Sequence, residues 1–224
     1  MPYNKVIAIG DSFTRGDELV DCYTHSRIAP HHTHSLSTWP ALIAKELGIE
    51  YDCMTIGGRG NHWISMSVSE YLEKHRDALF IINWSWFERF DYIDIETGEW
   101  KVTHPRHNQQ LNHYFYKNID SDQWNLHRNL QQIHSTLCLL EQNKVDFIMT
   151  CLDPMIHTKA HFVKPLQDQV LHRVINFYGY TFLEWAKHNG FELGPNGHPL
   201  EEAHAEAAKY INTNVIEGMT NEHR

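Results

Sequence analysis

Short apolar runs alternate with longer segments of helical periodicity along most of this 224-residue chain. The first run, Val6–Ile9, passes directly into Gly10 and Asp11, which is the pattern of a buried strand that ends in a turn. Similar runs predict three further strands, within residues 49–56, 78–83 and 145–152. Because helical segments separate these strands, we expect them to lie parallel and to be covered on both faces.

The segments between the strands carry helix start and stop signals. Thr38 is a candidate N-cap, Pro40 suits a first helical turn, and Gly48 follows the last apolar residue of that helix. Further helices are expected at about residues 63–75, 122–143 and 199–216. This alternation predicts a three-layer α/β/α fold of flavodoxin-like type with a parallel sheet of four to five strands. The fifth strand has no assignment, since residues 177–193 show no clear period.

An insertion at about residues 88–118 interrupts the alternation. Residues 92–95 and 100–103 alternate between apolar and polar positions on either side of Glu96–Glu99, which predicts a β-hairpin. The hairpin would leave the sheet at the end of the third strand, and its aromatic content suits a wall of a substrate cleft. A cap over the fold or an oligomer contact are the alternatives.

Composition narrows the class of protein. A hydrophobic content of 42% fits one α/β domain, and we expect residues 1–224 to form it. The formal net charge of −9 argues against nucleic acid as a partner. The sequence holds no apolar run long enough to span a membrane and opens without the pattern of a signal peptide, so we expect a cytoplasmic protein with no membrane partner.

Cysteine and histidine are the remaining candidates for special chemistry. The four cysteines are widely spaced, without a CxxC motif, so we expect reduced and packed thiols at Cys22, Cys53, Cys138 and Cys151. The 18 histidines include two clusters, one at His25, His31, His32 and His34 and one at His104, His107 and His113. No HExxH motif occurs, which favours a polar surface over a metal site, and we expect neither a metal nor an organic cofactor.

Polar residues follow the ends of the predicted strands. Ser12 comes just after the first strand, where the start of a helix would direct free N–H groups toward its hydroxyl. A plain helix N-cap is the alternative. Gly58 and Asn83 end the second and third strands, and His198 lies on a turn before the last helix. A hydroxyl, an imidazole and N–H donors are the groups that acyl transfer requires, and an α/β sheet brings strand ends to one edge.

These blocks together resemble the SGNH hydrolases, also called the GDSL esterases and lipases. The resemblance rests on Gly10–Asp11–Ser12, on Gly58–Ile64, on Asn83 and on His198–Pro199. It implies that Ser12 is the nucleophile and His198 the general base. It also implies that the N–H groups of Ser12 and Gly58 and the amide of Asn83 hold the oxyanion. The expected reaction is hydrolysis of an O-acyl ester of a small or carbohydrate-like alcohol, such as a glycan ester.

One position departs from the pattern of the family. The aspartate that usually precedes the histidine by two or three residues is replaced here by Asn196 or Pro195. Asn196 is therefore the sequence candidate for the third catalytic position, and on this hypothesis Asn196→Asp should raise turnover because the imidazolium would gain a negative partner. Three alternatives stay open: a Ser–His dyad oriented by a backbone carbonyl, another carboxylate that reaches His198, or a degenerate site in a non-catalytic carbohydrate- or protein-binding protein.

Overall fold

A parallel four-stranded sheet forms the centre of the molecule, with strand order β2-β1-β3-β6. The computed structural model describes residues 3–22, 34–104, 110–216 and 218. The strands are β1 (Lys5–Gly10), β2 (Glu50–Thr55), β3 (Ala78–Trp84) and β6 (Phe147–Cys151). The four strands predicted from the sequence are confirmed, and each boundary lies within about two residues of its expected place.

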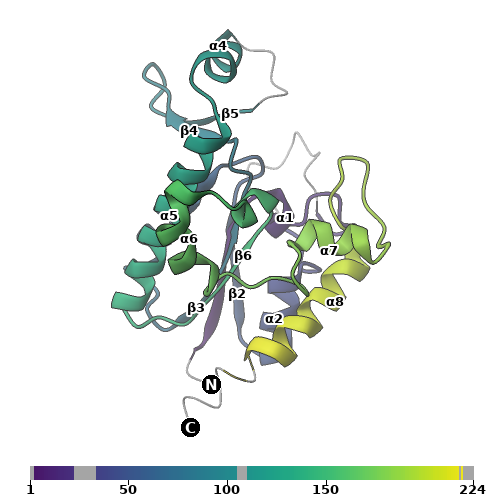
Figure 1. The fold of residues 1–224 in the computed structure, drawn as a ribbon. Helices are drawn as coiled ribbons and strands as arrows, with labels where there is room; N and C mark the ends of the chain where they lie inside the picture. Colours follow the sequence, from purple (N-terminus) through teal and green to yellow (C-terminus); the bar gives the residue numbers. More distant parts are fainter. Residues whose placement is uncertain (1–2, 23–33, 105–109, 217, 219–224) are drawn as a thin grey trace.

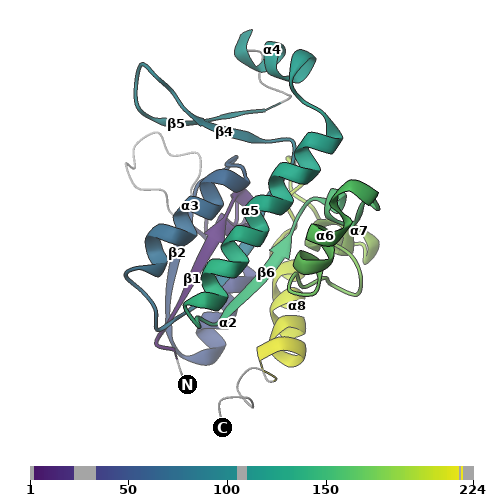
Figure 2. The same ribbon diagram turned by 60° about the vertical axis from the view of Figure 1, so that its left-hand side comes forward.

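Helices cover both faces of the sheet, which confirms the predicted three layers (Figures 1 and 2). One layer holds α3 (Asn61–Leu72), α5 (Asp122–Gln142) and α6 (Lys164–Leu171). The other holds α2 (Trp39–Leu47), α7 (Phe182–His188) and α8 (Glu201–Ile211). The expected signals of α2 are in place, since Thr38 is its N-cap, Pro40 lies in its first turn and Gly48 ends it at a φ of 68°. Helices α6 and α7 were not predicted.

The most strongly apolar runs of the sequence form the strands that helices cover on both faces of the sheet. Every residue of β3 is buried, and Val6–Ile9 of β1 are fully covered. At the sheet edge, β2 is more polar and partly exposed, and Lys5 of β1 pairs there with Asp52 at 2.7 Å. The hydrophobic pattern therefore reports the depth of each strand in the sheet.

Beside β6, the sheet continues as a single bridge. Val174 pairs with Met149 in parallel, and the Ile175 N–H donates to the Met149 carbonyl at 2.8 Å. One bridge is too short for a strand, which explains why the sequence offered no clear signal for a fifth one. The short helical turns η1 (Pro154–His157) and η2 (His161–Val163) lie between β6 and α6, and the π-helical turn η3 (Asn212–Ile216) follows α8.

The insertion forms the predicted hairpin, with β4 (Phe90–Ile93) antiparallel to β5 (Trp100–Thr103). A helix that the sequence pattern did not indicate, α4 (Gln110–Asn118), follows it before the chain enters α5. The hairpin and α4 project beyond the carboxyl ends of the sheet strands (Figure 2). They therefore stand over the edge at which Ser12 was expected.

The remaining expectations concern thiols, metals and membranes. The four cysteines are reduced, as expected, but Cys138 is exposed rather than packed. Across the described ranges, no three His, Cys, Asp or Glu side chains are grouped as ligands for a metal ion. His25, His31, His32 and His107 lie outside those ranges. In the same ranges, no helix is both long and apolar enough to cross a bilayer.

A buried histidine lies where α8 packs against α2. The side chain of His204 is 1% exposed, and its Nδ1 accepts a hydrogen bond from the Trp39 N–H at 3.1 Å. Burial, reinforced by the nearby His198, lowers the pKa of His204 from 6.5 to about 3. The folded protein therefore holds this imidazole in its neutral form.

We expect His204 to make the protein sensitive to acid. Its contribution to stability is complete above pH 6.5 and is lost progressively as the pH falls toward 3, because only the unfolded chain takes up the proton. His204→Asn keeps an acceptor near Nδ1 but cannot titrate, so its melting temperature should fall less steeply between these pH values. Exposed His172 offers the control variant, His172→Asn. If the melting temperature of His204→Asn fell with pH as steeply as that of the wild type, His204 would not be the source of the acid sensitivity.

Candidate active site

Ser12 lies in a tight turn that leaves the central strand. Asp11 caps the four-residue helix α1 (Ser12–Arg15), and its Oδ1 accepts the Phe13 N–H at 3.1 Å. The turn needs Gly10 for space, because a Cβ there would lie 2.2 Å from Oγ1 of Thr14. Gly10 itself does not have a positive φ. The left-handed backbone conformation lies at Gly16, which ends α1. Close packing therefore fixes how the hydroxyl of Ser12 is presented.

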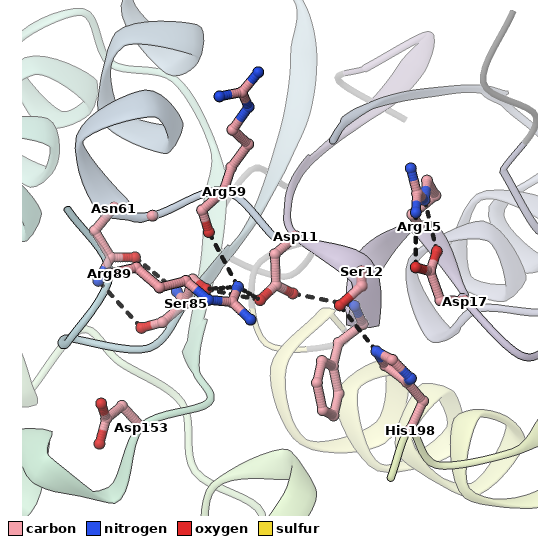
Figure 3. A network of polar contacts seen from close by, with 12 residues as sticks. Asp11, Ser12, Arg15, Asp17, Arg59, Asn61, Ser85, Arg89, Asp153 and His198 are labelled. Atoms are coloured by element: carbon pink, nitrogen blue, oxygen red, sulfur yellow. Dashed lines mark hydrogen bonds and ion pairs between the residues drawn. The ribbon is translucent and has the colours of Figure 1, made fainter. Parts of the chain in front are cut away.

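His198 meets Ser12 as the sequence motif required. Its Nε2 lies 2.9 Å from Oγ of Ser12, and its ring packs against Phe13 at a centroid distance of 4.7 Å. Figure 3 shows the imidazole directed at the hydroxyl. The histidine lies on a turn in which the Gly194 N–H donates to the His198 carbonyl at 2.8 Å, just before α8. Two residues from opposite ends of the chain are thus within hydrogen-bonding distance.

The partner of the second imidazole nitrogen is Glu18. Its Oε2 lies 2.7 Å from Nδ1 of His198. The carboxylate belongs to the loop after α1, where Glu18 has a φ of 73°, an uncommon value for a residue with a side chain. Gly194 makes this approach feasible, because a Cβ there would lie 2.7 Å from Cδ of Glu18. Ser12, His198 and Glu18 form one chain of hydrogen bonds.

Hydrogen bonds keep the Glu18 carboxylate ionised. Burial raises the pKa of Glu18, but the backbone N–H of Asn196 and the side chain and backbone of His198 outweigh it, so the pKa lies below its usual 4.5. A charged carboxylate is therefore available to His198 at neutral pH. Such a group fixes the imidazole in the tautomer with Nδ1–H directed at Glu18 and leaves Nε2 free to accept a proton from Ser12.

Asn196 does not occupy the position expected from the sequence. Its backbone N–H and its side-chain Nδ2 both donate to Oε1 of Glu18, at 2.8 and 3.0 Å. It thus orients the carboxylate rather than the imidazole. Of the three alternatives, the structure matches the second, a carboxylate from elsewhere that reaches His198. No sequence signal singled out this carboxylate, because Glu18 is one of three acidic residues in the stretch Asp17–Asp21.

The loop after β2 presents a bare backbone at Gly58. This glycine has a φ of 81°, and no described atom lies within 4 Å of the position that a Cβ would take. At the preceding residue, Gly57, the space that a side chain would take is filled by Arg15 and Asp17, which form an ion pair at 2.6 Å. The backbone of Gly58 is therefore open on the side where a side chain would stand.

Asn83 lies deeper than its expected role suggests. It is fully buried beside Gly10, and its Oδ1 accepts from Oγ1 of Thr150 at 2.8 Å. Its Nδ2 is buried and has no hydrogen-bond partner among the residues that the structure describes. The amide therefore has donor capacity to spare, although the side chain is fully buried.

A buried ion pair supports the Ser12 turn from the side opposite to His198 (Figure 3). Oδ2 of Asp11 lies 2.8 Å from Nη1 of Arg89 and accepts from Oγ of Ser85 at 2.7 Å. Asp11 is fully buried and Arg89 is 7% exposed. The Asp of the motif is thus a structural anchor, and Arg89 and Ser85 are site residues that the sequence pattern did not reveal.

No protein-family model matches the sequence. No curated protein matches it either. Among solved structures, the esterase EstA from Pseudoalteromonas sp. aligns with a TM-score of 0.54 and 10% identity, over 97% of this chain and 99% of that one. The acetyl xylan esterase Est2A from Butyrivibrio proteoclasticus aligns with a TM-score of 0.52 and 14% identity, over 97% of this chain and 65% of that one. The chain has the SGNH-hydrolase fold.

A carbohydrate esterase family 2 enzyme with a carbohydrate-binding domain, from Corynascus thermopiles, shares this fold at a TM-score of 0.54 and 14% identity. The alignment covers 97% of this chain and 67% of that enzyme. The present chain thus spans about two thirds of the length of the two carbohydrate esterases. At such identities the likeness concerns the SGNH-hydrolase fold, and the chemistry must be argued from the site itself.

The position of Asn196 leads to a prediction opposite to the one from sequence alone. Asn196→Asp would place a second carboxylate against Oε1 of Glu18, which raises the pKa of Glu18 and disturbs its contact with His198. We expect turnover to fall, by roughly tenfold if about 1.4 kcal/mol of orientation is lost. The measurement is ester hydrolysis as a function of pH.

The control for this substitution is Asn196→Ala, which removes one hydrogen bond to Glu18 but adds no charge. It should lose less activity than Asn196→Asp. A variant Asn196→Asp that turns over faster than the wild type would restore Asn196 as the third member of the site.

Proposed function

We propose that this protein is a serine ester hydrolase in which Ser12, His198 and Glu18 act as a catalytic triad. The observation that carries the proposal is the unbroken chain of hydrogen bonds from Oγ of Ser12 through His198 to Glu18, at 2.9 and 2.7 Å. Such a chain of nucleophile, base and orienting carboxylate is recognised by geometry rather than by sequence order. The proposal takes residues 1–224 as one SGNH-hydrolase-like domain with an insertion at about 88–118.

In the proposed mechanism Ser12 attacks the ester carbonyl while Nε2 of His198 removes its proton. Glu18 stabilises the imidazolium that forms and keeps its ring in place. The tetrahedral intermediate collapses when His198 returns the proton to the leaving alcohol, which leaves an acyl group on Ser12. Water, activated by the same imidazole, then releases the acid. The chemistry needs no metal or organic cofactor.

The oxyanion would be held by the backbone N–H groups of Ser12 and Gly58, with the amide of Asn83 as a third donor. The open approach to Gly58 supports its assignment, since donors must stand where the charge develops. The unpartnered Nδ2 of Asn83 supports the third assignment.

The substrate class we propose is an O-acyl ester of a small or carbohydrate-like alcohol. Structures of the same fold are described as an acetyl xylan esterase and as carbohydrate esterases, one of them in complex with cellohexaose. A non-catalytic binding protein on this scaffold is the alternative, and a further neighbour is described as showing both catalytic and non-catalytic binding functions. The complete chain from Ser12 to Glu18 favours the enzyme.

Covalent labelling decides between enzyme and binding protein. A fluorophosphonate should modify the wild type at Ser12, as read by peptide mass spectrometry, and Ser12→Ala should be silent although it folds. Glu18→Gln should be labelled slowly and lose roughly 10⁴-fold in turnover, because a neutral partner favours the wrong tautomer of His198. Exposed Glu192, beside the same turn, provides the control Glu192→Gln, which should retain full activity. A folded wild type that is neither labelled nor active would falsify the proposal.

Asn83 can be tested apart from its structural role. Asn83→Ala removes both the free amide N–H₂ and the hydrogen bond to Thr150, and it should lower kcat by roughly 10²–10³-fold if the amide binds the oxyanion. Thr150→Val breaks the same hydrogen bond but leaves the N–H₂ in place, so it should lower the melting temperature alone. Equal kcat values in the two variants would assign Asn83 to strand packing.

A further inference from the structure

Arg89 lies just before β4, at the base of the hairpin insertion, and reaches back toward the Ser12 turn (Figure 3). Its Nη1 is within hydrogen-bonding distance of three oxygens. These are Oδ2 of Asp11 at 2.8 Å, Oγ of Ser85 at 2.7 Å and the carbonyl of Arg59 at 3.1 Å. One nitrogen thus contacts the ends of three different loops.

Two of those loops carry the proposed oxyanion donors. Asp11 immediately precedes Ser12, and Arg59 immediately follows Gly58. The loops follow β1 and β2, which are neighbours in the sheet. Beyond the last paired residues the sheet no longer fixes the distance between them. The shared contact to Arg89 does so instead, on the buried side of the site.

A second residue of the hairpin holds the Gly58 loop from the other end. Oδ1 of Asp91 accepts the Gly60 N–H at 2.8 Å, and Oδ2 accepts the Trp63 N–H at 3.0 Å. Asp91 thus caps the start of α3, where Gly60 makes no side-chain cap of its own. Packing is close, since a Cβ on Gly60 would lie 2.7 Å from Oδ2 of Asp91. The insertion therefore holds both the carbonyl and the N–H of the peptide that joins Arg59 to Gly60.

The base of the hairpin is itself anchored to the helical layer. Nη2 of Arg128, on α5, donates to the carbonyls of Phe87 and Arg89 at 2.6 and 3.0 Å. Its guanidinium also stacks on Trp124 at 4.4 Å from the ring centroid. The backbone at Arg89 is thus tied to α5.

We propose that Arg89 is a positioning residue that sets the separation between the N–H groups of Ser12 and Gly58, so that the hairpin insertion is part of the catalytic apparatus. The inference rests on the proposed function. Because oxyanion donors act only on the charge of the transition state, displacement of the two loops reduces kcat and leaves KM nearly unchanged. If Arg89 served only to neutralise Asp11, its loss would lower the stability of the protein and leave kcat unchanged.

The direct test uses Arg89→Lys and the double variant Asp11→Asn/Arg89→Met. Lysine keeps a cation beside Asp11, but its side chain is shorter and lacks the planar guanidinium that reaches several acceptors at once. Arg89→Lys should therefore retain only part of the wild-type kcat. The double variant removes both buried charges, and its asparagine retains an oxygen acceptor for the Phe13 N–H, so it is expected to fold. We expect kcat for p-nitrophenyl acetate to fall in the double variant by roughly 10²-fold, within the range for loss of one oxyanion donor.

A boronic acid inhibitor supplies the second readout, because its adduct with Ser12 places a charged oxygen in the oxyanion site. Its inhibition constant should rise in parallel with the loss in kcat. Arg173→Met is the control: this arginine pairs with Glu141 at 3.2 Å and stacks on Phe147, neither of which belongs to the hairpin or to the loops of Ser12 and Gly58, so its loss should lower the melting temperature but not the inhibitor affinity.

The outcomes separate this inference from the proposed function. A wild type that resists fluorophosphonate and does not hydrolyse the ester overturns both. A wild type that is active, with wild-type kcat and inhibitor affinity in Arg89→Lys and in the double variant, overturns the role of Arg89 alone. Loss of inhibitor affinity in Arg173→Met equal to that in Arg89→Lys would also overturn it, since a general loss of stability would then explain both.

Discussion

The carboxylate of Glu18 receives four hydrogen bonds from the turn that carries His198, two from Asn196 and two from the histidine itself. The rest of the site depends on this contact. It orients the imidazole, it supplies the negative charge behind it, and it joins the loop after α1 to the turn before α8. Because several N–H groups share the carboxylate, its charge is compensated although the side chain is largely buried.

A second buried carboxylate, Asp11, holds the turn of Ser12 on the side away from His198. Its ion pair with Arg89 is shielded from water, so removal of either partner alone leaves an unpaired buried charge. The two carboxylates have different tasks. Glu18 acts through His198, whereas Asp11 holds the turn of Ser12 against the hairpin base. Ser12 is thus fixed between one polar cluster from the C-terminal turn and another from the insertion.

Much of the fold follows from local pattern. The strands and the helices α2, α3, α5 and α8 were predicted because a buried strand or an amphipathic helix carries its signal within one short window. Helices α4, α6 and α7 were missed: they are short, and neither α4 nor α6 buries more than a small part of its surface. The hairpin was predicted from its alternation, but its contacts to the loops of Ser12 and Gly58 have no local signal.

The sequence alone determined the parallel α/β/α architecture, the presentation of Ser12 at the end of a strand, and the meeting of Ser12 with His198 that the motif implies. It left the third member of the site open and favoured Asn196, the neighbour of the histidine along the chain. Only the tertiary structure brought Glu18 against His198 and Arg89 against Asp11. The physical reason is that both act through contacts between distant segments, and a carboxylate or guanidinium acquires such a partner only when the sheet has brought its loops to one edge.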